Sequence, residues 1–276
     1  MYLFDPTHSS HPVAETQIDA SNVNTLGASG SFMAQPFGGA PTVVSGVAYI
    51  GDWGGNFYAI RTSDGALLWK QFVGLAATPG NPICMPAIGV TGQSVIKDGV
   101  VYVPGGDSAL YALDRQSGSQ IWRVQLADPE SGSYIWSSLT LLNNSIYLGM
   151  ASLADCPVVR GALIRVDLNN PQQPVYSYVM SEDDVGAGIW STPAFDTETN
   201  TIYAATGNGA QDVSSGSYGS TFLSFDAQSL EIKAYFFLPT VSDFGDDDWG
   251  SSPTLFQTGD GTRLTDRPWS KGYRHC

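Results

Sequence analysis

The sequence predicts an all-β fold, a β-propeller of four-stranded antiparallel blades with about four and a half blades present. Three observations predict it. A hairpin of two apolar strands joined by a polar turn, with a tyrosine in its second strand, recurs four times in the 276 residues. The tyrosines are Tyr49, Tyr102, Tyr147 and Tyr203, and successive ones lie 45 to 56 residues apart. The 31 glycines are typical of β structure with many turns.

The first two blades carry the clearest signal. In the first blade, a tyrosine hairpin at 43–51 is followed by strand-like segments at 56–60 and 66–70. In the second, a hairpin at 95–103 is followed by segments at 109–114 and 120–124. Asp64-Gly65 and Ser117-Gly118 precede the fourth strands and tolerate the positive φ of a tight hairpin. Trp69 and Trp122 stand at matching places in these strands, which supports a repeat.

The later blades follow the same plan. Their hairpins lie around Tyr147 and Tyr203, and their third strands at 162–167 and 221–226. We expect one propeller domain at 1–262, with blades at about 40–75, 92–127, 137–180, 190–238 and 249–262. The segment 263–276 is basic and does not alternate, so it predicts a tail outside the pattern. Because a toroid must close, we interpret the chain as a truncated, incomplete ring; a small closed propeller with an irregular fifth blade is the alternative.

Composition excludes several functions. The net charge is −14, and basic residues cluster only near the end, which argues against nucleic acid. No run of about 20 apolar residues predicts a membrane span, and residues 1–20 lack the pattern of a signal peptide. Of the three cysteines, Cys84 and Cys156 either pair across the channel mouth or remain as two buried thiols.

Residues just before the innermost strands should ring one mouth of the propeller. The starts of the inner strands also repeat there, as Ile135-Trp136-Ser137, Ile189-Trp190-Ser191 and Trp249-Gly250-Ser251. Two of these segments are acidic, one at Glu182-Asp183-Asp184 and one that ends at Asp248. Carboxylates, an amide and aromatic faces around one opening could hold a hard cation and a flat ligand. The alternative is that the acidic loops are only solvated surface.

These repeats resemble those of the quinoprotein alcohol dehydrogenases, whose propellers hold pyrroloquinoline quinone (PQQ), and most closely the polyvinyl-alcohol-dehydrogenase-like branch. The likeness begins at Asp5-Pro6-Thr7-His8 and continues to about residue 258. It implies a quinone floor at Trp190 and a calcium ligand at Asn208 in Thr206-Gly207-Asn208. It also implies a catalytic aspartate at Asp247 or Asp248, with Asp247 slightly favoured by its spacing to Gly250.

The resemblance extends to one further segment and one cysteine. Asp155 precedes Arg160-Gly161 as an acidic calcium ligand does in the family, and Arg160 is then expected at the cofactor. Many family members carry two adjacent cysteines above the quinone, where this chain has only Cys84. No Cys-x-x-Cys-His is present for haem attachment, so an external electron acceptor is expected.

The function implied by the resemblance is oxidation of a small-molecule or polymeric alcohol with PQQ and calcium, in a periplasmic or secreted protein. A hydride passes to the quinone, calcium polarises the quinone carbonyl, and an aspartate removes the hydroxyl proton. Two alternatives belong to other classes. One is a non-catalytic propeller that binds proteins, like the outer-membrane assembly lipoproteins, and the other is a fragment that does not function alone.

Overall fold

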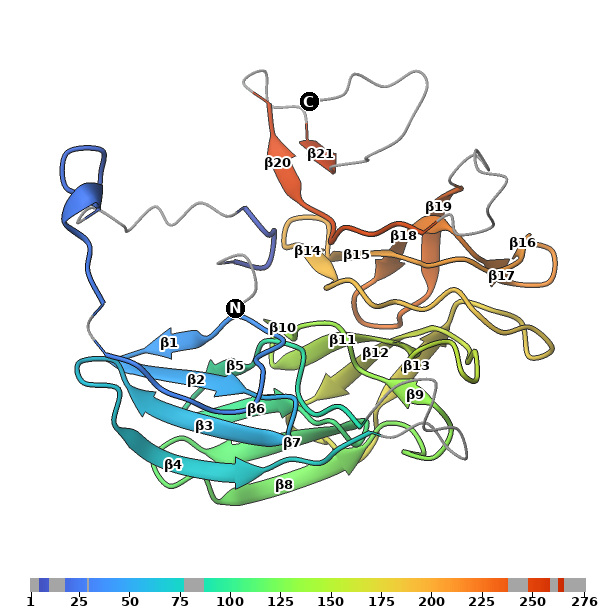
Figure 1. The fold of residues 1–276 in the computed structure, drawn as a ribbon. Helices are drawn as coiled ribbons and strands as arrows, with labels where there is room; N and C mark the ends of the chain where they lie inside the picture. Colours follow the sequence, from blue (N-terminus) through green and yellow to red (C-terminus); the bar gives the residue numbers. More distant parts are fainter. Residues whose placement is uncertain are drawn as a thin grey trace.

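The computed structural model describes residues 5–9, 18–28, 30–76, 87–237, 248–258 and 263–265. Within them the chain is a series of antiparallel sheets with one short 3₁₀ turn, η1 (Val23–Thr25). Within the described residues three sheets have four strands, one sheet has five, and two are two-stranded pairs. Figure 1 shows them in chain order, from the blue strands β1–β4 to the red pair β20–β21. The predicted propeller architecture is therefore confirmed.

The strands of each sheet run outward from a short inner strand. In the first two sheets they are β1 (Thr42–Val44), β2 (Val47–Gly51), β3 (Asn56–Arg61), β4 (Leu67–Phe72), β5 (Val95–Lys97), β6 (Val100–Pro104), β7 (Ala109–Asp114) and β8 (Gln120–Gln125). In the third they are β10 (Thr140–Leu142), β11 (Ser145–Ser152), β12 (Ala162–Asp167) and β13 (Val175–Tyr178), with β9 (Ser133–Tyr134) added beside β11. The fourth has β14 (Ala194–Asp196), β15 (Thr201–Ala205), β18 (Thr221–Asp226) and β19 (Ile232–Phe237).

Two small pairs complete the fold. The first is the hairpin of β16 (Gln211–Asp212) and β17 (Ser217–Tyr218), which lies in the loop between β15 and β18 of the fourth sheet. The second is β20 (Leu255–Gln257) with β21 (Arg263–Thr265). The tail expected at 263–276 therefore needs correction, since 263–265 pair with β20. A short edge strand tolerates the charge and the missing alternation that argued against it. Residues 266–276 lie outside the described part.

The four repeat tyrosines occupy one register position. Each lies on the second strand of its sheet, and its backbone partner is the first residue of the inner strand. The pairs are Thr42↔Tyr49, Val95↔Tyr102, Thr140↔Tyr147 and Ala194↔Tyr203. Tyr49 and Tyr102 also pack on Trp69 and Trp122, at 5.9 and 5.7 Å between ring centroids. The repeat therefore reflects one packing solution used again in each blade.

The hydrophobic core lies between successive sheets. Phe57 and Trp69 of the first sheet pack with Val101 and Leu113 of the second. The same arrangement joins the second sheet to the third and the third to the fourth, with Leu148 and Phe225 among the fully buried side chains. Trp249 extends it beyond the fourth sheet by packing on Phe222. Each blade thus buries its faces against its neighbours, as a propeller requires.

Hydroxyl groups link the inner edges of the blades. The backbone N–H of Gln93 donates to Ser138 Oγ at 2.9 Å, and that of Ser138 donates to Thr192 Oγ1 at 3.0 Å. The backbone N–H of Thr192 then donates to Ser252 Oγ at 3.0 Å. We call Ser138, Thr192 and Ser252 the hydroxyl ladder. Each rung stands two or three residues before an inner strand, so it sets that strand against the preceding blade.

The N-terminal segment 5–9 joins the fourth and fifth inner strands. The Phe195 N–H on β14 donates to Pro6 O at 2.7 Å, and the Leu255 N–H on β20 donates to Thr7 O at 2.9 Å. His8 is fully buried, with Nδ1 2.7 Å from the carbonyl oxygen of Pro253. Since a carbonyl only accepts, Nδ1 carries the proton. The described part of the chain contains no helix long and apolar enough to cross a membrane.

Candidate functional site

Strand alternation decides which loops share one mouth of the propeller. Because the strands of each blade alternate in direction, loops between second and third strands lie at the same end as loops between blades. In the first two sheets the former are short, at 52–55 and 105–108. In the next two they lengthen to 153–161 and 206–220. The two long loops carry Asp155, Arg160 and Asn208, so these predicted site residues belong to one end of the molecule.

Asn208 and Asp248 meet at this mouth. The Gly207 N–H donates to Gly188 O at 2.9 Å, and the Ala187 N–H donates to Asn208 O at 2.7 Å, which sets the Asn208 segment beside the Trp190 segment. The Asn208 N–H donates to the carboxylate of Asp248. A Cβ built on Gly207 would lie 3.0 Å from Asp248 Oδ1, so a larger residue there would push the Asp248 carboxylate away. Three segments therefore converge here: 187–188 and Asp248, which lie in loops between blades, and 207–208, which lies in the loop between β15 and β18.

Trp190 differs from its counterpart one blade earlier. Trp136 packs on Tyr134 at 4.9 Å between centroids, and its Nε1 donates to Ser152 O at 2.9 Å. Trp190 is half-buried and makes no ring contact or hydrogen bond among the described residues. The next residue differs in the same way. The buried Ser191 Oγ has no hydrogen-bond partner among the described residues, whereas the equivalent Ser137 Oγ bonds to the backbone of Gly149. Trp190 therefore lacks the aromatic partner and the hydrogen bond that hold Trp136 in its blade.

The hydroxyl ladder gives the same alignment of the inner-strand motifs as the sequence does. With Ser138, Thr192 and Ser252 matched, Trp249 falls opposite Ile135 and Ile189, all of them buried between blades. Gly250 then takes the place of Trp136 and Trp190. A Cβ on Gly250 would lie 3.5 Å from Cη2 of Trp190, so the Trp190 ring reaches the next blade where that blade has no side chain.

Arg160 and Asp155 are placed differently from this group. The Arg160 guanidinium lies 4.3 Å from the centroid of the Tyr178 ring, and its Nη2 donates to Met180 O at 2.8 Å. Both partners lie at or just after the outer strand of the third blade. Asp155 is exposed, has a φ of 54°, and makes no hydrogen bond or ion pair within the described ranges. The Arg160 segment pairs with Gly186 through the Gly161 N–H to Gly186 O bond at 2.9 Å, so it borders the loop that leads to Trp190. Among the described residues, no hydrogen bond or ion pair joins the side chains of Arg160 or Asp155 to Trp190, Asn208 or Asp248.

Two predicted residues, Cys84 and Asp247, lie outside the described residues. Cys156 is disulfide-bonded, which removes the alternative of a free buried thiol for that residue. The other two cysteines of the chain, Cys84 and Cys276, both lie outside the described part.

The donor set decides which ions suit this mouth. Asn208 and Asp248 offer amide and carboxylate oxygens, the ligands that calcium takes. Among the described residues, no cluster of three or more His, Cys, Asp or Glu side chains is positioned to bind a metal. The donor atoms are therefore of the type that a hard cation such as calcium prefers. A calcium ion there would take the rest of its six to eight oxygens from a bound ligand, water or residues beyond the described ranges.

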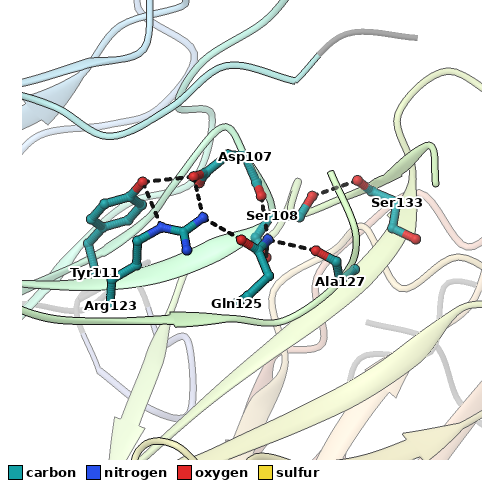
Figure 2. Close-up of polar contacts among 7 residues, drawn as sticks. All are labelled: Asp107, Ser108, Tyr111, Arg123, Gln125, Ala127 and Ser133. Carbon is teal, nitrogen blue, oxygen red and sulfur yellow. Dashed lines mark hydrogen bonds and ion pairs between the residues drawn. The ribbon is translucent and has the colours of Figure 1, made fainter. Parts of the chain in front are cut away.

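A second polar cluster at the same end joins Asp107, Tyr111 and Arg123, although Asp107 Oδ1 is buried without a hydrogen-bond partner among the described residues. Figure 2 shows Arg123 Nη2 paired with Asp107 Oδ2 at 2.5 Å, while the Tyr111 hydroxyl donates to the same oxygen at 2.8 Å. Arg123 Nε donates back to the Tyr111 oxygen at 3.0 Å. Burial, followed by the bond to Asp107, raises the pKa of Tyr111 to about 12, so the phenol stays protonated. Sequence reasoning missed this cluster, which fixes the 105–108 loop.

The chain is similar in sequence to a propeller family and to several quinoprotein dehydrogenases. A family model described as outer membrane protein assembly factor BamB, PQQ_2, matches residues 16–231. The quinohemoprotein alcohol dehydrogenase of Comamonas testosteroni is 26% identical over 224 residues, which cover 70% of this chain and 31% of that protein. A polyvinylalcohol dehydrogenase from Pseudomonas sp is 22% identical over 199 residues, covering 63% and 30%.

A solved structure agrees with the sequence relatives. The crystal structure of the Comamonas testosteroni quinohemoprotein alcohol dehydrogenase superposes with a TM-score of 0.71 at 20% identity, over 90% of this chain and 42% of that one. At this identity the likeness concerns the fold. The chain thus spans less than a third of the length of these curated relatives.

Proposed function

We propose that this chain, which belongs to the PQQ_2 family of quinoprotein-like β-propellers, carries part of a site that oxidises an alcohol with PQQ and calcium. The observation that carries the proposal is the hydrogen bond from the Asn208 N–H to the Asp248 carboxylate, at a mouth where the Trp190 ring lies beside Gly250. Each side chain comes from a different loop, and each is of the kind that such a site needs. Sequence relatives that are quinoprotein alcohol dehydrogenases support the same conclusion.

Each residue has a distinct role in this proposal. Trp190 is half-buried and has no aromatic partner within the described ranges, and a planar ligand can stack on the exposed part of its ring. Asn208 provides an oxygen donor for calcium, while Asp248 holds the Asn208 backbone in place. Asp247 or Asp248 removes the hydroxyl proton of the alcohol. When bound, the quinone supplies a hydride acceptor and calcium polarises its carbonyl.

The disulfide at Cys156 supports an extracytoplasmic location. Disulfides persist in oxidising compartments and are rare in the cytosol. A periplasmic or secreted protein is therefore the location we propose. An external electron acceptor would complete each turnover.

The experiment is dye-linked alcohol oxidation after reconstitution with PQQ and calcium. Substitutions Asp247→Asn and Asp248→Asn remove one carboxylate each, and Asp183→Asn is the control, because Asp183 is exposed and makes no contact in the described part. We expect the wild type and the control to be active, and one of the two variants to lose at least about 100-fold in rate. Two variants as active as the wild type would remove the base assignment.

A second candidate function is a scaffold that binds other proteins. The description of the matching family model, an outer-membrane assembly factor, favours it. A scaffold needs neither quinone nor calcium. A wild-type protein that binds no PQQ in the presence of calcium would make this the better account.

A further inference from the structure

The acidic segment at the mouth contains one residue with a specific set of partners. Asp184 Oδ2 accepts from Ser217 Oγ at 2.6 Å and from Ser181 Oγ at 2.9 Å. Ser217 is fully buried, and its oxygen also accepts from the Ser181 N–H at 3.3 Å. Ser217 lies on β17, whereas Asp184 and Ser181 lie in the loop between β13 and β14. The carboxylate therefore joins two separate loops.

Those two loops are the ones that carry the site. The loop between β13 and β14 leads to Trp190, and the loop between β15 and β18 carries Asn208 as its third residue and contains the β16–β17 hairpin. Figure 1 shows this hairpin projecting from the fourth sheet. Near the site, the loops are joined by the Ala187–Asn208 and Gly207–Gly188 backbone bonds. At their far ends the Tyr218 N–H donates to Val179 O at 2.9 Å, close to the carboxylate.

We propose that Asp184 is a positioning residue, which fixes the β16–β17 hairpin and thereby holds Asn208 in register with Trp190. A hydrogen bond to an ionised group is roughly twice as strong as a neutral one, so the Asp184–Ser217 bond is a stronger link between the two loops than a bond between neutral side chains would be. Hydrogen bonds from Ser217 and then Ser181 hold the pKa of Asp184 below its ordinary value of 3.8, so the carboxylate stays ionised at neutral pH.

The neighbouring acidic residues provide a matched control. Glu182 and Asp183 are exposed and make no hydrogen bond or ion pair among the described residues. They carry the same charge on the same loop, so general electrostatics at the mouth would affect all three positions alike. Only a role that depends on the Ser181 and Ser217 contacts sets Asp184 apart.

The first test is amide hydrogen exchange of the protein without ligand. We expect Asp184→Ala to speed exchange several-fold in the segments 179–191 and 206–220, with the second blade unchanged. Asp184→Asn should restore part of the protection, because its amide oxygen still accepts both hydroxyls, and Asp183→Ala should match the wild type. Equal exchange in Asp184→Ala and Asp183→Ala, or faster exchange throughout the molecule, would overturn the proposal.

A second readout relates the link to the site and rests on the proposed function. With PQQ and calcium, we expect Asp184→Ala to weaken quinone binding several-fold, and Asp183→Ala to leave it unchanged. Unchanged quinone affinity in Asp184→Ala would contradict the positioning role. If the wild type binds no quinone, the proposed function fails, while hydrogen exchange still decides whether Asp184 holds the two loops together.

Discussion

At the scale of single residues, matched positions in the repeat distinguish structural from functional side chains. Trp136 and Trp190 occupy equivalent places, yet only Trp136 is held by an aromatic partner and a hydrogen bond. The repeated inner-strand motifs in the sequence place Trp249 opposite Ile135 and Ile189, and the hydroxyl ladder has the same alignment. Burial identifies Trp249 as the equivalent of Ile189.

His8 predicts a pH dependence of stability. Burial holds its pKa below the ordinary value of 6.5, so the unfolded chain binds the proton more readily than the folded one. The contribution of neutral His8 to stability is therefore fully present above pH 6.5 and is lost as the pH falls through the lower, folded-state pKa. We expect the free energy of unfolding by urea to decrease from pH 7 to pH 5. His8→Asn should flatten this slope, and an unchanged slope in that variant would show that His8 is not the cause.

At the scale of elements, strands were predictable and short inserted pairs were not. The apolar hairpins with their tyrosines predict β2, β6, β11 and β15, because each strand is long enough to show alternation. Strands of two residues, such as β16 and β17, show no periodicity and depend on contacts such as that between Ser217 and Asp184. The Asp107–Arg123 cluster was missed for the same reason, since its partners lie on two strands and a loop.

The hydroxyl ladder predicts a stability cost at the inner edge of the blades. Thr192→Val keeps the shape of the buried side chain but leaves the Ser138 N–H without its acceptor. An unsatisfied buried donor costs about 1–3 kcal/mol, so the midpoint of thermal unfolding should fall by several degrees. Thr192→Ser retains the oxygen and should stay close to the wild type. Equal midpoints in the valine and serine variants would mean that the ladder contributes little.

At the scale of the whole molecule, the fold follows from packing between repeats, whereas the site does not. Every blade buries apolar residues against the next, so repeated letters in the sequence suffice to predict the architecture. The site, by contrast, depends on the long loops between the second and third strands of a blade and on their contacts with loops between blades. The resemblance pointed to Trp190, Asn208 and Asp248, and the backbone bonds between 186–188 and 206–209 explain why they converge. Arg160, by contrast, packs on Tyr178 within its own blade.

The measurement that tests the central claim most directly is an equilibrium titration with PQQ, with and without calcium, followed by tryptophan fluorescence. We expect saturable binding that requires calcium and weakens about tenfold in Trp190→Ala, since stacking on an aromatic ring is worth roughly 1 kcal/mol or more. Ile121→Ala, which removes an exposed side chain on the outer strand β8 of the second blade, should bind like the wild type. Quinone binding that is absent, or that persists equally without calcium and without the Trp190 ring, would contradict the assignment of this mouth as a quinone site.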